Sequence, residues 1–286
     1  MEKQKRVMAI HDISCVGRCS LTVALPIISA AGHECGVLPT AVLSTHTGGF
    51  EDFTYRDLTI DIGPISTHWQ SLGLSFDAMY SGFLGSFEQV DLVAQLFAAF
   101  KRPGGVIMVD PVMGDEGKLY SIFGKEMAQG MARLCGAADI IIPNITEACF
   151  MVDEEYKSGP YDKGYIENLL NKLAALGPKQ IVLTSTWFDE SKLGAAVFDN
   201  GRVDYVFGPR IGGHFHGTGD TYGAALLAAL LTGLSLAKAA QIACNYVYEC
   251  ISISVKLGQE RRYGVAFEKA LPSLMKQLNL AYSNPT

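Results

Sequence analysis

Short apolar runs alternate with longer amphipathic segments along most of the chain. The short runs predict strands at 6–11, 35–43, 77–82, 105–110, 138–144, 180–186, 194–199 and 202–208. The longer segments predict helices at 20–32, 64–74, 87–101, 124–136 and 165–177. Repeated strand–helix units are typical of a mainly parallel sheet that is covered by helices on both faces. The pattern therefore predicts an α/β fold.

The last two predicted strands are separated by Asn200-Gly201, a strong signal for a two-residue hairpin turn. We therefore expect antiparallel strands at one edge of the sheet. After residue 217 the pattern predicts helices to the end, and the apolar run 224–231 is too short to span a bilayer. No linker, repeat or low-complexity tract divides the chain, so we expect one domain over residues 1–286.

Composition narrows the class of protein. Apolar residues make up 49% of the 286 residues, which is enough for a large core, and the formal net charge is −6. This charge argues against a broad nucleic-acid-binding surface. The N-terminal stretch lacks the long apolar region of a signal peptide, and no apolar run reaches 18 residues. We expect a cytoplasmic protein that binds neither nucleic acid nor membrane.

The seven cysteines do not form a metal-binding or disulfide pattern. Their number is odd, there is no CxxC pair, and Cys15 and Cys19 have no second pair with zinc spacing. We expect reduced and mostly buried thiols.

Polar and glycine residues gather where the predicted strands end. These residues are Asp12 and Gly17, the stretch 44–50, Phe83 and Gly85, the stretches 110–120 and 143–147, Ser185 and Thr186, and the loop into 217–220. Because ligands bind at the carboxyl ends of parallel strands, this pattern predicts a binding site along one rim of the sheet.

The tetrapeptide Gly217-Thr218-Gly219-Asp220 directly precedes the Ala/Leu-rich helix. A helix N-terminus exposes unpaired N–H groups, which suit a phosphate, and glycines let the backbone approach closely. Asp220 could then accept a proton from a hydroxyl that attacks the phosphate. The alternative is that Asp220 simply caps the helix, since Asp is a favoured capping residue.

Two further loops carry oxygen ligands. "DPVMGDEG" contains Asp110, Asp115 and Glu116, and "PNITE" contains Asn144 and Glu147. Such groups suit Mg²⁺ bound to nucleotide phosphates. The alternative is a pair of solvated turns, with Asn144 or Thr146 capping the next helix.

Several other polar side chains are candidates for the same rim. His46 and Thr47 lie in a glycine-bearing loop and are candidate substrate contacts. His214 and His216 suggest a metal pair, but no third ligand is evident and loop packing is favoured. Lys118 and Tyr120 belong to a flap or to an exposed loop, and Arg210 is a candidate cation for nucleotide phosphates. The GxGxxG fingerprint is missing after the first strand, and GxxxxGK[ST] is absent. Their absence argues against a nicotinamide-dependent dehydrogenase and against a P-loop enzyme.

Taken in order, "DPVMGD", "ADIIIPNITE" and "GTGD" resemble the ribokinase-like superfamily. Within it, "LSTHTGGF" and "DPVMGDEGKLY" look like the vitamin B6 kinases, and the resemblance runs from about residue 6 to about residue 260. It implies a three-layer α/β/α fold and ATP-dependent phosphorylation of the 5′-hydroxymethyl group of pyridoxal, pyridoxine or pyridoxamine.

The resemblance also implies roles for individual residues. Asp220 would be the base, and the N–H groups of Gly217, Thr218 and Gly219 would form an anion hole for the transferred phosphoryl group. Asp110, Asp115, Asn144 and Glu147 would organise Mg²⁺ and the triphosphate; Thr184 and Ser185, with Thr218, would meet the nucleotide; His46, Thr47, Phe83 and Tyr120 would line the vitamer pocket. A homodimer is implied, and whether K⁺ is needed stays open.

One position departs from the resemblance. B6 kinases usually place a serine where this chain has Asp12, in an Ile-His-Asp context, although Ser14 could substitute for it. An aspartate there would favour a protonated pyridinium ring. The alternative is a hydroxymethylpyrimidine kinase of thiamin synthesis. A non-catalytic regulator that binds a nucleotide or a vitamer is a third interpretation, which the intact Asp220 disfavours.

Overall fold

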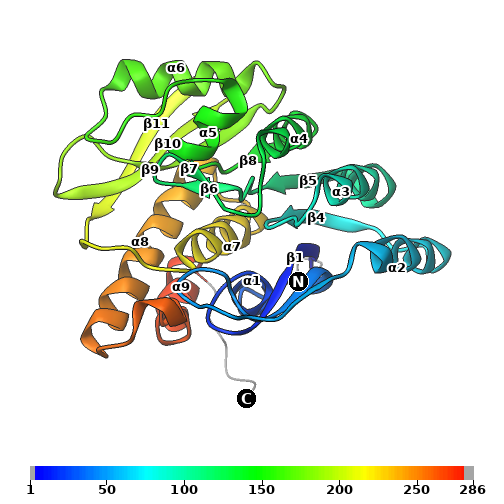
Figure 1. The fold of residues 1–286 in the computed structure, drawn as a ribbon. Coiled ribbons are helices and arrows are strands. Elements are labelled where there is room, and N and C mark those ends of the chain that lie inside the picture. Colours follow the sequence, from blue (N-terminus) through cyan, green and yellow to red (C-terminus); the bar gives the residue numbers. More distant parts are fainter. Residues whose placement is uncertain (1–3, 280–286) are drawn as a thin grey trace.

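A single sheet organises the fold of residues 4–279, which are the residues that the computed structural model describes (Figure 1). Its strands are β1 (Arg6–Val16), β2 (Glu34–Thr45), β3 (Tyr55–Asp57), β4 (Phe76–Ser81), β5 (Lys101–Val109), β8 (Ile140–Ile141), β9 (Gln180–Thr186), β10 (Lys192–Asp199) and β11 (Arg202–Pro209). They lie in the order β11-β10-β9-β8-β5-β4-β1-β2-β3. All neighbours from β9 to β2 are parallel, whereas β3, β10 and β11 pair antiparallel.

Helices cover both faces of this sheet, as the alternating pattern predicts. They are α1 (Leu21–Ala30), α2 (Thr59–Ser71), α3 (Phe87–Phe100), α4 (Lys125–Gly136), α5 (Ile145–Val152), α6 (Lys163–Ala174), α7 (Thr218–Leu231), α8 (Leu236–Lys256) and α9 (Phe267–Gln277), with a short 3₁₀ helix at Arg261–Tyr263. One buried cluster joins the sheet to α1, α7, α8 and α9, and a second joins it to α2 through α6. The predicted three-layer α/β/α fold is confirmed.

The hairpin prediction is also confirmed. Asp199 pairs with Arg202, and the two turn residues, Asn200 and Gly201, both have positive φ, at 51° and 93°. Positive φ at both central positions is the requirement of the turn that matches strand twist.

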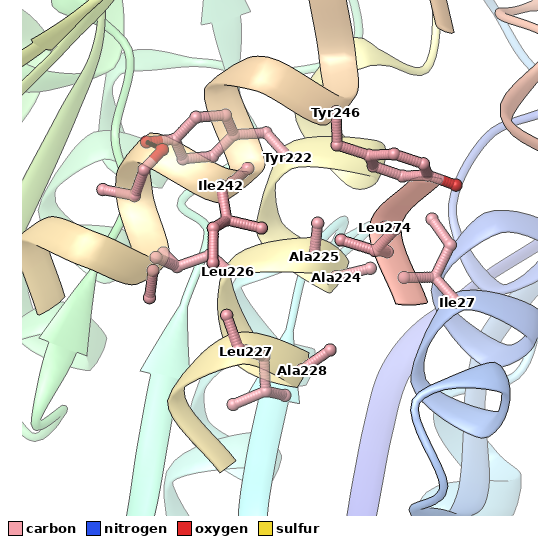
Figure 2. Packing of buried hydrophobic residues seen from close by; sticks show 14 of the residues in the cluster. Ile27, Tyr222, Ala224, Ala225, Leu226, Leu227, Ala228, Ile242, Tyr246 and Leu274 are labelled. Carbon is pink, nitrogen blue, oxygen red and sulfur yellow. Dashed lines mark hydrogen bonds between the residues drawn. The ribbon is translucent and has the colours of Figure 1, made fainter. Parts of the chain in front are cut away.

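Helix α7 is buried on all sides from Thr221 to Ala229. Tyr222 through Ala229 are inaccessible or nearly so, and they pack against α1, α8 and α9 (Figure 2). The prediction of a helix after residue 217 is confirmed. No helix within residues 4–279 has the length and apolarity to cross a membrane.

Some predicted boundaries are wrong. Strand β1 runs past residue 11 to Val16, because its polar second half pairs with β2 as far as Val16↔Thr45. Helix α2 begins at Thr59, five residues before the predicted start, and β8 holds only two residues of the predicted strand 138–144. A two-stranded hairpin, β6 (Gly114–Asp115) with β7 (Lys118–Leu119), forms inside the loop that follows β5.

The cysteine prediction is confirmed for the described chain. All seven cysteines are free thiols; five are buried, Cys35 is partly buried and Cys15 is exposed.

Candidate active site

The tetrapeptide 217–220 forms the start of α7. Gly217 is the N-cap in the left-handed region (φ 73°), and a Cβ there would collide with the carbonyl oxygen of Arg18. Thr218, Gly219 and Asp220 form the first turn and keep some exposure to solvent. The N–H groups of a first helical turn lack intrahelical acceptors, so this turn can receive an anion.

Asp220 lies in the same turn as these donors. Its surroundings raise the pKa of its carboxyl group to about 7, mainly because the carboxylate is desolvated and also because Asp12 is negatively charged; the backbone N–H of Ser20 acts in the opposite direction. A carboxylate with a pKa near the working pH is suited to accept a proton from a hydroxyl group.

Asp12 reaches the same place from β1. Its side chain is buried (4% exposed) and accepts a hydrogen bond from the Ser14 hydroxyl at 3.1 Å. Burial raises the pKa of Asp12, while the Ser20 and Ser14 hydroxyls lower it. Ser20 therefore influences both carboxylates, through its hydroxyl at Asp12 and its backbone N–H at Asp220.

The backbone of Ser20 is unusual. It is the N-cap of α1, yet its φ of 58° is left-handed and its side chain makes no capping hydrogen bond. Serine is a favoured N-cap because its hydroxyl normally bonds the first helical turn. Non-glycine residues with positive φ are held in place by their surroundings, and they cluster at functional sites.

More negative charge gathers beside Asp220 at the carboxyl end of β5. Asp110 is buried (7% exposed), and its pKa is raised by burial and then by the charges of Glu147 and Asp220. The hydroxyl of Tyr80, on β4, lies within electrostatic reach of Asp110 and Asp220 and has no hydrogen-bond partner among residues 4–279. The predicted rim thus brings Asp110, Glu147 and Asp220 together.

Asn144 and Glu147 have a structural task at the start of α5. The Asn144 side chain accepts from the Glu147 N–H at 2.9 Å, and the Glu147 carboxylate accepts from the Asn144 N–H at 2.8 Å. This reciprocal pair is a capping box. Asn144 Nδ2 also donates to the carbonyl of Gly114 (2.9 Å), and Glu147 accepts from the N–H of Met113 (3.2 Å). Both residues therefore fasten the 110–120 loop to α5, and their roles toward a nucleotide stay predictions.

The positions and hydrogen bonds of these carboxylates affect where a metal ion could bind. Within residues 4–279 no group of three or more His, Cys, Asp or Glu side chains is arranged to hold one. Glu147 is already bonded to two backbone N–H groups, and Asp115 lies on the β6–β7 hairpin. The prediction that Asp110, Asp115 and Glu147 organise Mg²⁺ together with the triphosphate stays a prediction. The donor chemistry still fits Mg²⁺, which proteins often bind through one or two carboxylates together with substrate phosphates. Asp110 is the carboxylate best placed for that.

The β6–β7 hairpin lies in the loop that follows β5. The Gly117 N–H donates to the Thr146 hydroxyl at 2.9 Å, which ties the hairpin to α5. Tyr120 follows the hairpin, is 41% exposed, and lies within electrostatic reach of Asp110, Asp115, Glu147 and Asp220. The segment is therefore a defined element near the carboxylates, and its action as a flap stays a prediction.

Three further residues, His46, Thr47 and Phe83, were predicted to bind the substrate ring. His46 is buried, with Nδ1 accepting from the Gly48 N–H at 3.1 Å and Nε2 bonded to the carbonyl of Arg262 at 2.5 Å. Both of its nitrogens are thus engaged within the protein. Thr47 is exposed, and Phe83 is half-buried with its ring 5.7 Å from that of Phe123. Contacts of these residues with a substrate stay predictions.

Of the residues predicted to bind the nucleotide, Thr184 and Ser185 lie in the last three residues of β9, and Arg210 directly follows β11. The Thr184 hydroxyl donates to the carbonyl of Pro143 at 3.2 Å, and Ser185 is exposed at a bulge with φ 58°. Arg210 is also exposed, and its guanidinium stacks 4.0 Å from the Trp187 ring centre. Trp187 is a rim residue that sequence reasoning missed, although it comes directly after a predicted strand.

His214 and His216 pack against each other, with ring centres 4.8 Å apart. Among residues 4–279 they belong to no group of three or more potential metal ligands, and the preference for loop packing over a metal pair stays a prediction. The sequence analysis did not identify Ser20 and Tyr80 as residues of the site. A serine beside an apolar helix, and a tyrosine inside an apolar strand, give no signal of their own.

The fold and this site place the chain among the small-molecule kinases. A family model described as phosphomethylpyrimidine kinase matches residues 29–264, and the chain belongs to that family.

The names of individual relatives refer to two kinase activities with different substrates. A protein from Bacteroides thetaiotaomicron, provisionally named a phosphomethylpyrimidine kinase and crystallised with pyridoxal, is 36% identical, with a TM-score of 0.90 over 95% of this chain and 96% of its own. The pyridoxal kinase PdxY of Rubrobacter xylanophilus is 24% identical over 93% of both chains. The hydroxymethylpyrimidine/phosphomethylpyrimidine kinase of Haemophilus influenzae is 28% identical over 62% of this chain and 66% of its own length. The ribokinase-like kinase class is shown, and the relatives include both kinase types.

Proposed function

We propose that this protein is an ATP-dependent kinase of vitamin B6 vitamers, which phosphorylates the 5′-hydroxymethyl group of pyridoxal, pyridoxine or pyridoxamine. The observation that carries the proposal is Asp220, with a pKa near 7, in the same helical turn as the bare N–H groups of residues 217–219. The proposal also includes a cytoplasmic homodimer with one kinase domain.

The proposed reaction is a direct displacement. The substrate hydroxyl gives its proton to Asp220 as its oxygen bonds to the γ-phosphorus, and the bond from that phosphorus to the β–γ bridging oxygen breaks to release ADP. The N–H groups of residues 217–219 stabilise the charge on the transferred group, and each such donor is typically worth a few kcal/mol. Mg²⁺, bound near Asp110, would neutralise charge on the phosphates.

Asp12 supports a B6 vitamer as the substrate. It is a buried carboxylate, held by the Ser14 and Ser20 hydroxyls, at the end of the site where we place the ring. A buried carboxylate favours a cationic partner, which a protonated pyridine nitrogen provides. Phe83 and Tyr120 would line the ring, while Thr184, Ser185 and Arg210 would contact the nucleotide.

A hydroxymethylpyrimidine kinase is the second candidate, and the matching family model favours it. Its substrate also carries a hydroxymethyl group on an aromatic nitrogen ring, so the same base and anion hole would serve. A non-catalytic regulator is less well supported, because binding alone needs no carboxylate of raised pKa in the anion-binding turn.

A substrate panel separates these candidates. Pyridoxal, pyridoxine, pyridoxamine and hydroxymethylpyrimidine are each incubated with MgATP, and ADP and the phosphorylated product are both quantified. We expect turnover of at least one B6 vitamer at a higher kcat/KM than the pyrimidine. Turnover of the pyrimidine alone would replace the proposal with the second candidate, and no turnover with tight binding would favour a regulator.

A further inference from the structure

The imidazole of His216 connects three loops of the site. Its ring centre is 5.0 Å from that of His46, in the loop 44–50, and 4.8 Å from that of His214. His214 Nδ1 in turn lies 3.9 Å from a carboxylate oxygen of Asp115 on the β6–β7 hairpin. His216 is also the residue directly before Gly217, the N-cap of the proposed anion hole.

The contact between His216 and the loop 44–50 leaves no room for a side chain. A Cβ at Gly48 would lie 2.5 Å from Cε1 and 2.7 Å from Nδ1 of His216. Non-bonded atoms essentially never approach this closely, so any residue other than glycine at position 48 must shift the imidazole or the loop backbone. The chain therefore has glycine at a place where its backbone meets the ring.

The loop side of this contact is fixed in place. Nδ1 of His46 accepts from the Gly48 N–H, so Nε2 carries the proton and donates to the carbonyl of Arg262. With both nitrogens bonded to backbone, His46 cannot serve as a metal ligand without breaking these bonds. The His46 ring thus orients the 44–50 loop and presents a rigid face to His216.

The helix side is fixed as well. Phe215 is buried, and its carbonyl accepts from the Thr218 hydroxyl at 3.1 Å, while the Gly217 carbonyl accepts from the Thr221 hydroxyl at 2.7 Å. Since His216 lies between these two anchored residues, a displacement of its ring would be passed to the Gly217 backbone. Burial and the neighbouring histidines lower the pKa of His216 to about 4, so this is packing of a neutral ring near pH 7.

We propose that His216 is a positioning residue that couples the seating of the 44–50 loop to the geometry of the anion hole at residues 217–219. This proposal rests on the proposed phosphoryl transfer, but it does not depend on which ring is the substrate. When the loop is in place, the imidazole fits against Gly48 and holds Gly217 in its left-handed conformation. When it is displaced, the N–H groups that stabilise the transferred phosphoryl group lose their alignment.

A rescue experiment tests the coupling. Gly48→Ala should lower kcat roughly ten- to a hundredfold, because small misplacements of catalytic groups can cost that much. His216→Ala should lower kcat as well, while His216→Phe, which keeps an aromatic ring, should stay within about threefold of the wild type. In the double variant, which combines Gly48→Ala with His216→Ala, the methyl group added at position 48 occupies the space left by the imidazole. Its kcat should therefore exceed that of Gly48→Ala at least threefold.

His214→Ala is the matched control, since it removes the neighbouring imidazole that does not contact Gly48. It should change kcat less than about threefold, and the KM for ATP should stay within twofold in every variant. The proposal is overturned if His216→Ala retains wild-type kcat, or if the effects of Gly48→Ala and His216→Ala simply multiply. Circular dichroism and melting curves check that each variant folds.

The readout is turnover of whichever substrate the wild type accepts, or ATP hydrolysis if it accepts none. If only the pyrimidine is phosphorylated, the proposed function fails while the rescue still decides the role of His216.

Discussion

The two ends of helix α7 contrast in almost every physical respect. The first turn, Thr218–Asp220, keeps some solvent exposure and lies among carboxylates. The turns from Tyr222 to Ala229 are buried, and they pack against Ile27, Ile242 and Leu274 from three other helices (Figure 2). One continuous helix thus joins a charged site to the apolar core.

The difference between the two ends shows how the fold stays stable although the charged site lowers its stability. Desolvation raises the pKa of Asp12, Asp110, Glu147 and Asp220, and neighbouring like charges raise it further for the last three, which means that ionising these groups costs folding free energy. Apolar burial along the rest of α7 offsets that cost. We therefore expect changes in the first turn to affect activity and changes further along to affect stability.

The largest expected effect is on turnover in Asp220→Asn. Loss of the base should lower kcat by roughly 10²- to 10⁴-fold with little change in ATP binding. The folded state raises the pKa of Asp220, so it binds this proton more tightly than the unfolded state does. The resulting stabilisation of the fold is fully present below the pKa of the unfolded state and is lost as the pH rises through about 7. The variant should therefore melt at a higher temperature than the wild type at pH 8, and this difference should vanish near pH 4. Near-normal turnover would show that Asp220 is not the base.

Leu227→Ala probes the other end of the helix. Leu227 is fully buried, and removing a buried leucine side chain typically costs about 2–5 kcal/mol of unfolding free energy. Denaturant unfolding should show that loss, whereas kcat per folded molecule should stay close to the wild-type value. A large fall in kcat with unchanged stability would contradict the division between the two ends.

The pH dependence of kcat/KM sharpens the comparison further. Asp220 acts in its ionised form, so activity should fall about tenfold per pH unit below a pKa near 7. Since the charge of Asp12 raises the pKa of Asp220, Asp12→Asn should move this acid limb to lower pH. An acid limb that stays in place in Asp12→Asn would show that the two carboxylates are not coupled.

The spacing of apolar residues predicted the sheet and its helical layers because burial of one face of each element imposes that spacing. The strands of the sheet, the layers of helices and the hairpin at Asn200-Gly201 all follow from which positions must avoid water. What it could not predict are pairings driven by partners far away in sequence. The extension of β1 to Val16 depends on β2, and the β6–β7 hairpin depends on Thr146 and Asn144 of α5.

The same limit applies to the site. Asp220, Asp110 and Tyr120 follow from position, because the residues after parallel strands converge at one rim. Asn144 and Glu147 converge there too, but their side chains bond to backbone and to each other, which only the capping geometry reveals. Ser20 could not be found from the sequence because what distinguishes it is a backbone angle. His216 was named only as one of a possible metal pair, since its contact with Gly48 joins residues far apart in the sequence.

The central claim is that the first turn of α7 transfers phosphoryl groups to a B6 vitamer. The most direct test follows the formation of pyridoxal 5′-phosphate from pyridoxal and MgATP by wild-type protein and by Asp220→Asn, with hydroxymethylpyrimidine as the competing substrate. The account predicts product from the wild type, a loss of at least a hundredfold in the variant, and preference for pyridoxal over the pyrimidine. Phosphorylation of the pyrimidine alone, or equal rates for wild type and variant, would contradict it.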